Sequence, residues 1–333
     1  MRRFITGGLL VAVTLLGLPF AAAAQNGGAA VLQITPSARA DGMGQAYVAL
    51  ADDPAGAWWN PAGLGFQRSN AAMTNYVKLV PGLADDVYHV YLGYLHHSQN
   101  WGTFAASVSY LSYGTNIITG PNSNGGTDSL GTFTSSELSP ALSFGTMLTH
   151  GVAMGFNVKL VRVNLAPTSA LAQVGITGSG SGSSVALDIG LLGRDSVKLG
   201  GEDMELSGGV SILNLGPKIS FVDQAYADDL PRTLRVGAAG RLHFLPGYSA
   251  MATLELQKSM LSGGDQIWHA GSEIELAGTL AGRAGFVHDP NGDISSMTYG
   301  LGVKISGMEL DFASIPQATG LDRVKKFDLL AHF

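Results

Sequence analysis

Three ionisable side chains at alternate positions of one short stretch could carry out acid–base chemistry. In IWHAGSEIELA, residues 267–277, His269, Glu273 and Glu275 fall on one face if the stretch is a β-strand, because successive side chains of a strand point to opposite faces. A histidine near two carboxyl groups can supply a general base and a general acid. Charged residues on the polar face of a strand are far more often structural, and we favour that interpretation.

Three further motifs resemble binding sites but each lacks a required part. HDPNGD, residues 288–293, has the oxygen-rich composition of a calcium loop without its distal glutamate, so a hairpin turn is the simpler interpretation. GSGSGSS, residues 178–184, has phosphate-loop composition, but no helix follows it. His96 and His97 point to opposite faces of a predicted strand and make a poor metal pair. We therefore predict no enzyme activity, no cofactor and no metal.

The most specific chemistry is concentrated in ADDPAGAWWNPAGLGF, residues 51–66. Asp52 and Asp53 can accept hydrogen bonds from backbone amides or pair with Arg39 or another cation. Asn60 precedes a proline, is held out of the helical region and can bond to its own backbone, which predicts a sharp turn. Direct contact with a ligand and a purely architectural role are both compatible with these residues.

The same segment contains aromatic and small residues that suit close packing. Trp58 and Trp59 could pack the segment against a larger body or line an apolar pocket. Gly42, Gly44 and Gly63 permit close backbone approach or a positive φ. The candidate site residues of this segment are Arg39, Gly42, Gly44, Asp52, Asp53, Trp58, Trp59, Asn60, Pro61, Ala62 and Gly63.

The first 24 residues have the pattern of a secretory signal peptide. Arg2 and Arg3 precede an apolar run over residues 4–20, and four alanines follow, which favours cleavage before Gln25. The run is shorter than the ~20 residues that a spanning helix needs. The chain contains no cysteine, which excludes disulfides and thiolate metal sites. We therefore expect a protein that works outside the cytoplasm.

The composition of the chain is unusual for a soluble protein. Only 13% of the residues are charged, against about a quarter in ordinary soluble domains, and the mean hydropathy is +0.21. Beyond the signal peptide, no stretch is apolar for long enough to form a membrane helix, so a spanning form would have to use strands. The net charge of −6 and the scattered cations argue against a nucleic-acid partner.

Residues 69–333 alternate apolar and polar residues with the period of a β-strand. In MTYGLGVKIS, residues 297–306, every second residue is apolar and those between are small or polar. About fourteen such segments occur, each close to the ~10 residues of a tilted membrane strand, and short connections alternate with longer ones. We predict an all-β fold, a transmembrane antiparallel β-barrel of about 14 strands in a Gram-negative-type outer membrane. Both termini are then periplasmic, and a secreted soluble β-sandwich or solenoid is the alternative.

Residues 25–68 do not alternate, which indicates a separate element. They predict a short helix or turn around residues 43–51, followed by a compact loop rich in proline and glycine. A barrel of fourteen strands is too wide to be filled by its own side chains, so its lumen can bury this apolar segment. We expect a signal peptide at 1–24, an N-terminal hatch or plug at 25–68, and the barrel at 69–333, with His269, Glu273 and Glu275 lining the lumen.

A family resemblance supports this division. ARADGMGQAYVALADDPAGAWWNPAGL, residues 38–64, closely resembles the N-terminal signature of the PorV/PorQ family within the FadL-like outer-membrane barrels. LPRTLRVGAAGRL, residues 230–242, and LAGRAGF, residues 280–286, are similar too. The resemblance implies a barrel of fourteen strands and a hatch with an Asn60-Pro61-Ala62 turn. It also implies that the C-terminal Phe333 is a barrel-assembly signal.

The resemblance implies two different functions. FadL-like members are implied to pass hydrophobic small molecules through a plugged lumen, which is our first hypothesis. Members closer to PorV are implied to act in type IX secretion and to bind protein partners or secreted substrates, which is the alternative. The expected contacts are therefore outer-membrane lipid, a hydrophobic small-molecule ligand, and secretion-system proteins.

Overall fold

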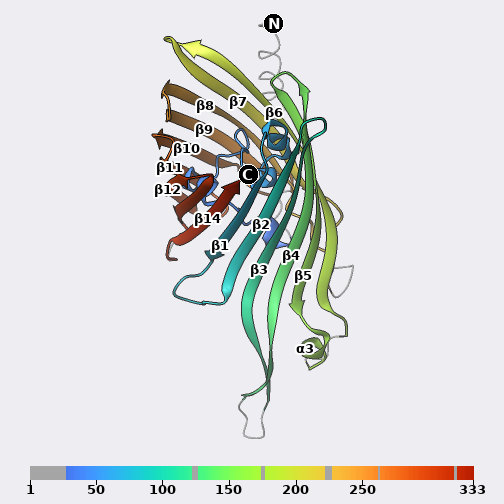
Figure 1. Ribbon diagram of the computed structural model, residues 1–333. Helices are drawn as coiled ribbons and strands as arrows, with labels where there is room; N and C mark the ends of the chain where they lie inside the picture. The colour runs from blue at the N-terminus through green and yellow to red at the C-terminus, as the bar shows by residue number, and fades with distance from the viewer. Residues whose placement is uncertain (1–27, 122–126, 174–176, 222–226, 262, 319–320) are drawn as a thin grey trace.

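Fourteen antiparallel strands form a closed barrel in which β1 pairs with β14, as the alternation predicted (Figure 1). The computed structural model describes residues 28–121, 127–173, 177–221, 227–261, 263–318 and 321–333, so the predicted signal peptide lies outside the described residues. Within these residues, no helix has both the length and the apolar character needed to cross a membrane. The strands are β1 (Ala71–Lys78), β2 (Val87–Ser98), β3 (Gly102–Pro121), β4 (Thr127–Thr149), β5 (Val152–Ala166), β6 (Gly180–Leu199), β7 (Glu202–Leu215), β8 (Thr233–Leu245), β9 (Tyr248–Ser259), β10 (Ile267–Leu276), β11 (Leu280–Asp289), β12 (Ile294–Ile305), β13 (Met308–Ile315) and β14 (Val324–His332).

The outward side chains of the strands are mostly apolar, and many of the inward ones are polar or small. On β12, Tyr299 and Leu301 are exposed while Thr298 is completely buried. On β13, Leu310 is exposed and its neighbours Glu309 and Asp311 are buried. Large exposed apolar side chains together with buried charges are the inverse of a soluble protein and match a barrel wall that faces lipid.

The two rims of the barrel differ in the length of their connections. One rim carries tight turns, such as the one between β12 and β13, and the end of β14. The opposite rim carries the longer connections, one of which contains the short helix α3 (Thr168–Gln173). At this long-connection rim, β3 and β4 continue well past their neighbours and form a projecting two-stranded ribbon (Figure 1).

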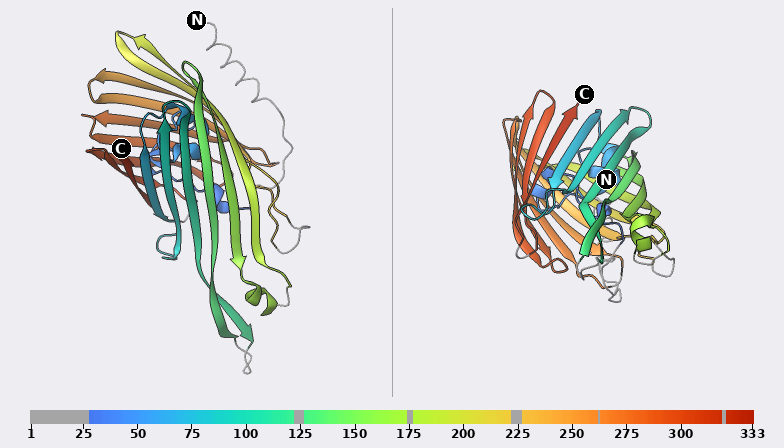
Figure 2. Two further views of the ribbon diagram at one scale, coloured as in Figure 1. Left: turned by 45° about the vertical axis from the view of Figure 1, so that its right-hand side comes forward. Right: turned by 90° about the horizontal axis from the view of Figure 1, so that it is seen from below.

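Residues 28–70, which we call the N-terminal segment, lie inside the barrel (Figure 2). The segment holds the helix α2 (Ala38–Gly42) and three 3-10 helices, Ala30–Leu32, Gly56–Trp58 and Pro61–Phe66. Residues 43–51, for which a short helix or turn was predicted, form turns, and α2 ends just before them. Ser37 caps α2 by accepting the backbone N–H of Ala40 at 3.3 Å, and Gly44 adopts a φ of +66° two residues after its end.

The N-terminal segment runs lengthwise through the lumen. The backbone N–H of Gly28 donates to the carbonyl of Asp229 at 2.9 Å, in the β7–β8 connection at the long-connection rim. At the other rim, the N–H of Phe333 donates to the carbonyl of Asn70, where the segment enters β1. The first and last described residues therefore lie at opposite rims. The prediction that both termini are periplasmic stays a prediction, because residues 1–27 are outside the described part of the chain.

Candidate functional site

The contact between the N-terminal segment and the barrel wall is the candidate site, because it gathers most of the buried polar chemistry. Glu255 on β9 accepts the backbone N–H groups of Tyr47 and Val48, both at 2.8 Å, through one carboxylate oxygen. Its other oxygen accepts from Arg235 on β8 at 2.5 Å. Thr298 on β12 accepts the N–H of Gly44 at 2.9 Å. Wall side chains thus bind backbone groups of the segment that water would otherwise solvate.

Seven charged residues, which we call the ion cluster, join the segment to four strands of the wall. Arg39 lies 2.7 Å from Asp52 within the segment and 3.0 Å from Glu273 on β10. Arg283 on β11 lies 2.7 Å from the same oxygen of Glu273 and also pairs with two carboxylates on β13. The members are Arg39, Asp52, Arg241, Glu273, Arg283, Glu309 and Asp311. Three cations face four carboxylates, so the charges of the cluster nearly balance.

Asp52 and Asp53 are adjacent, but their pKa values shift in opposite directions. Burial would raise the pKa of Asp52, but the guanidinium groups of Arg39 and Arg241 outweigh it and hold that pKa well below its usual range. Burial, with the negative charge of Asp52, raises the pKa of Asp53 to about 6. The hydroxyl of Tyr47 lies 2.5 Å from Asp52 and 2.9 Å from Asp53. That hydroxyl has one proton and can donate to only one of the two carboxyl groups at a time. A protonated Asp53 can donate its own proton to the oxygen of the Tyr47 hydroxyl while that hydroxyl donates to Asp52.

We predict that the N-terminal segment is held more tightly at acidic pH because of Asp53. Its folded pKa of about 6 lies above the unfolded value near 4, so its contribution is complete below about pH 4 and is lost as the pH rises through 6. Between pH 5 and pH 8, local opening measured by hydrogen exchange at residues 53–60, corrected for intrinsic rates, should increase roughly tenfold. Asp53→Asn should flatten this dependence, and an unchanged profile would contradict the assignment.

Asn60 forms the turn that its place before proline predicted. Its side-chain oxygen accepts the N–H of Ala62 at 3.1 Å, which caps the 3-10 helix that begins at Pro61. Its amide group donates to the carbonyls of Val48 and of Leu191 on β6, at 2.9 and 3.0 Å. The one side chain therefore shapes the turn and also connects it to the wall.

Glycines in the N-terminal segment and in the wall strands allow the two backbones to approach each other closely. A Cβ added at Gly155 on β5 would overlap the backbone of Pro61, and one added at Gly63 would overlap the carbonyl of Ala51. Gly300 on β12 meets Gly42 directly, as expected for a strand glycine that makes room for the segment. The removal of side chains on both sides permits backbone-to-backbone packing in the lumen.

The two tryptophans are packed inside the segment. Their rings meet edge to face with centroids 4.7 Å apart, and Trp59 meets Tyr47 in the same manner at 5.3 Å. Trp59 is completely buried. Trp58 is 8% exposed and borders a cavity, with the guanidinium of Arg235 over its ring at 5.1 Å. Trp58 is therefore the tryptophan that a small molecule could contact.

The remaining predicted residues have separate partners. His269 bonds through Nδ1 to the carbonyl of Gly44, at 2.7 Å, whereas Glu273 belongs to the ion cluster. Glu275 pairs with Lys304 at 3.2 Å, nearer the rim of tight turns. All three side chains face the lumen, but the two glutamates are engaged by cations, so the arrangement does not form an acid–base pair. Phe333 is exposed and stacks on Tyr94 with centroids 6.1 Å apart.

Several wall residues of the site were not singled out from the sequence. All of them are buried. Glu255 and Asp328 accept backbone N–H groups of the N-terminal segment, Arg235 pairs with Glu255, and Arg283 pairs with Glu273 and with two carboxylates on β13. Lys326 lies 2.5 Å from Asp41 of the segment. Each occupies the polar face of an alternating strand, which was the available signal. That pattern also fits a water-filled lumen and does not reveal which charges meet.

Comparison with known proteins yields one family and a group of similar folds. A family model described as type IX secretion system protein PorV matches residues 23–264. No curated protein matches. Among solved structures, the toluene transporter TbuX of Ralstonia pickettii aligns at 14% identity and a TM-score of 0.54, over 88% of this chain and 97% of its own. The toluene transporter TodX of Pseudomonas putida aligns at 15% identity and a TM-score of 0.52, over 95% of this chain and 98% of its own. At these identities the likeness establishes the fold, that of an outer-membrane barrel.

Proposed function

The chain belongs to the PorV family of type IX secretion system proteins, and from this premise we propose that it is a plugged outer-membrane barrel that binds secreted proteins or secretion-system partners. The binding surface in this proposal is the long-connection rim, on the outside of the cell. The N-terminal segment is the plug, which keeps the lumen closed while the rim is used for binding.

The projecting ribbon is the observation that carries the proposal. β3 pairs with β2 only as far as Tyr113, and β4 pairs with β5 only from Ser136 onward. Beyond these points the described parts of the ribbon, Thr115–Pro121 and Thr127–Thr134, pair only with each other. The N–H of Thr115 donates to Asp86, but in the described part of the chain no other strand pairs with the outer edges of the ribbon, so they can accept an added strand. Ile117 and Leu130 are 62% and 53% exposed. Strand addition to such an edge is a common way to bind an extended peptide.

The ion cluster supports the plug. Buried ion pairs such as that of Arg39 with Glu273 hold the N-terminal segment against the barrel wall. Breaking one partner of a buried pair costs about 3–5 kcal/mol, so several pairs together keep the segment in place. A lumen closed in this manner suits a binding platform better than an open channel.

Shortening the ribbon tests the proposed role directly. In cells that depend on this protein for secretion, replacing residues 115–134 by a tight turn should lower the amount of secreted protein at least roughly tenfold. The barrel should still reach the outer membrane, as judged by its heat-modifiable mobility on gels. Replacing α3 (Thr168–Gln173) at the same rim is the matched control. Normal secretion by the shortened variant would count against the ribbon as the binding surface.

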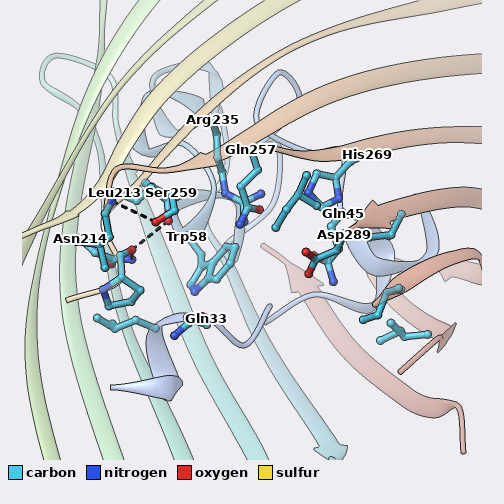
Figure 3. Close-up of a pocket in the computed structure, with 18 of the residues that line it drawn as sticks. Gln33, Gln45, Trp58, Leu213, Asn214, Arg235, Gln257, Ser259, His269 and Asp289 are labelled. Atoms are coloured by element: carbon cyan, nitrogen blue, oxygen red, sulfur yellow. Dashed lines mark hydrogen bonds between the residues drawn. The ribbon is translucent and has the colours of Figure 1, made fainter. Parts of the chain in front are cut away.

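Passage of a hydrophobic small molecule is a second candidate function, favoured by the cavity beside Trp58 and by the toluene-transporter fold. Mass spectrometry of protein extracted from its native membrane in mild detergent separates the two. A stoichiometric aromatic or fatty-acid-like ligand that is lost on Trp58→Ala, at the tryptophan that borders the cavity (Figure 3), supports passage. Stoichiometric secretion proteins without such a ligand support the first role.

A further inference from the structure

Tyrosines on the outer wall of the barrel mark the level of the lipid headgroups toward the long-connection rim. The rings of Tyr76 on β1 and Tyr110 on β3 both lie against that of Tyr88 on β2, at centroid distances of 5.8 and 6.1 Å. On the other side of β13 and β14, Tyr299 on β12 is 53% exposed. Tyrosines gather where the apolar band of a membrane barrel meets the headgroups. The part of the wall between these tyrosines therefore meets headgroups at the same level.

At this level the outer face of β14 changes from apolar to cationic. Leu329 and Phe327 are 41% and 50% exposed, and they face the membrane side of the wall. The next residue toward the rim on the same face is Lys325, because successive side chains of a strand alternate. Lys325 is exposed, whereas its chain neighbours Val324 and Lys326 are buried. The ammonium group of Lys325 is therefore on the outside of the barrel.

A second exposed lysine lies beside it on β1. The register pairs Val77 of β1 with Lys326 of β14, so the next residues, Lys78 and Lys325, lie opposite each other on the outer face. Like charges in directly opposite positions of neighbouring strands are destabilising unless an anion lies close to them. Asp85 pairs with Lys78 at 2.8 Å. Lys325 has no ion-pair partner in the part of the chain that the structure describes.

Arg323 is the third cation and is fixed on the outer wall. Its Nε donates to the hydroxyl of Ser314 on β13 at 2.9 Å, and one Nη donates to the carbonyls of Ser314 and Met297, both at 2.8 Å. Its guanidinium lies over the ring of Tyr299 at 5.6 Å. Ser314 is also the register partner of Lys325, so the two cations share a neighbour. The second Nη of the fixed guanidinium can donate to an anion.

Two acids lie near the cations without balancing them. Asp85 is already engaged by Lys78, and Asp322 precedes Arg323 in the chain. Among the described residues, neither acid forms an ion pair with Arg323 or Lys325. These two cations therefore keep their positive charge at the level where the phosphate groups of lipids lie. A phosphate accepts several charge-assisted hydrogen bonds at once, from guanidinium and ammonium groups alike.

We propose that Arg323, Lys325 and Lys78 form a binding site on the outer wall for the anionic phosphate headgroup of a membrane lipid. The phosphate lies between the two lysines and accepts from Arg323, and the acyl chains run along the wall over Phe327 and Leu329. The site is outside the lumen, so its occupation does not require the N-terminal segment to move. This inference goes beyond the secretion role and does not depend on it.

Native mass spectrometry of the purified full-length barrel in detergent tests the site. Phosphatidylglycerol and phosphatidylcholine with the same acyl chains are added separately, and bound lipid is counted at each concentration. We expect phosphatidylglycerol to bind roughly a hundredfold more tightly, since each basic residue near a membrane surface contributes about a factor of five. In Lys78→Gln/Lys325→Gln this preference should fall to about fivefold. Lys325→Gln alone, which keeps the pair of Lys78 with Asp85, should give an intermediate preference.

Two controls separate a lipid site from other effects of charge. Arg162→Gln removes an exposed cation from the outer face of β5, away from the site, and should keep the full preference. Glycerol 3-phosphate carries the phosphate without acyl chains and should not displace the lipid. An equal loss in Arg162→Gln, displacement by glycerol 3-phosphate, or an unchanged preference in the folded double variant would each overturn the proposal. Folding is judged by heat-modifiable mobility on gels, and none of these results bears on secretion.

Discussion

Arg283→Met should destabilise the folded barrel by about 3–5 kcal/mol, the largest loss expected for a single substitution in the ion cluster. The Arg283 side chain is completely buried, and its partners Glu273, Glu309 and Asp311 are 3%, 7% and 4% exposed. Methionine fills a similar volume but leaves three carboxylates facing one another in the lumen. Of these three carboxylates, only Glu273 would still pair with Arg39. Glu309 and Asp311 on β13 would therefore lose their main counter-charge.

Reversible urea unfolding in lipid vesicles measures this loss, and related variants separate charge from geometry. Arg283→Lys should fall between wild type and Arg283→Met, since an ammonium group cannot bond to three carboxylates in the planar fork of a guanidinium. Lys198→Met removes a cation from an exposed pair with Asp203 and should cost less than about 0.5 kcal/mol. A loss below about 1 kcal/mol for Arg283→Met would show that the cluster does not stabilise the fold.

Glu255→Ala should release the middle of the N-terminal segment from the wall. The substitution removes the acceptor for the N–H groups of Tyr47 and Val48 and leaves the buried Arg235 without its counter-ion. Bonds to a charged group contribute about 1.5–3 kcal/mol each, so local opening should become roughly a hundredfold more frequent. Hydrogen exchange at the amides of Tyr47 and Val48 reports this opening residue by residue.

Electrical recording gives a second readout of the same variant. Brief channel openings in planar bilayers should become frequent in Glu255→Ala and stay rare in wild type, because a displaced segment exposes the lumen. Glu205→Ala is the matched control, since Glu205 is 40% exposed and lies 4.0 Å from its only ion-pair partner in the described chain, Arg194. Equal exchange rates and equal conductance in both variants would mean that Glu255 does not anchor the segment.

Local sequence patterns were sufficient to predict the wall of the barrel. Alternation with period two is a property of each strand alone, and the structure has fourteen strands between Ala71 and His332, as this pattern predicted. The turn at Asn60 was predictable for a similar reason, because the proline that follows it and its own side chain restrict the backbone locally. The buried position of the adjoining tryptophans followed from their size and apolar character.

The pairing of charges in the lumen depended on the tertiary structure. The sequence placed Arg39, Asp52 and Glu273 among the candidate residues, and all three belong to the ion cluster. It did not single out Arg283 or Glu255, whose partners lie on other strands or about 200 residues away in the segment. A polar residue on the inner face of a strand predicts only that it faces the lumen.

The sequence by itself determined the barrel, its strand number and the separate character of the first residues, since these follow from short-range periodicity and composition. Only the tertiary structure decided the path of the N-terminal segment, the ion cluster and the cavity beside Trp58. The physical reason is that barrel closure and strand register set which inward side chains become neighbours. Register is a property of the whole sheet, and no stretch of the chain encodes it alone.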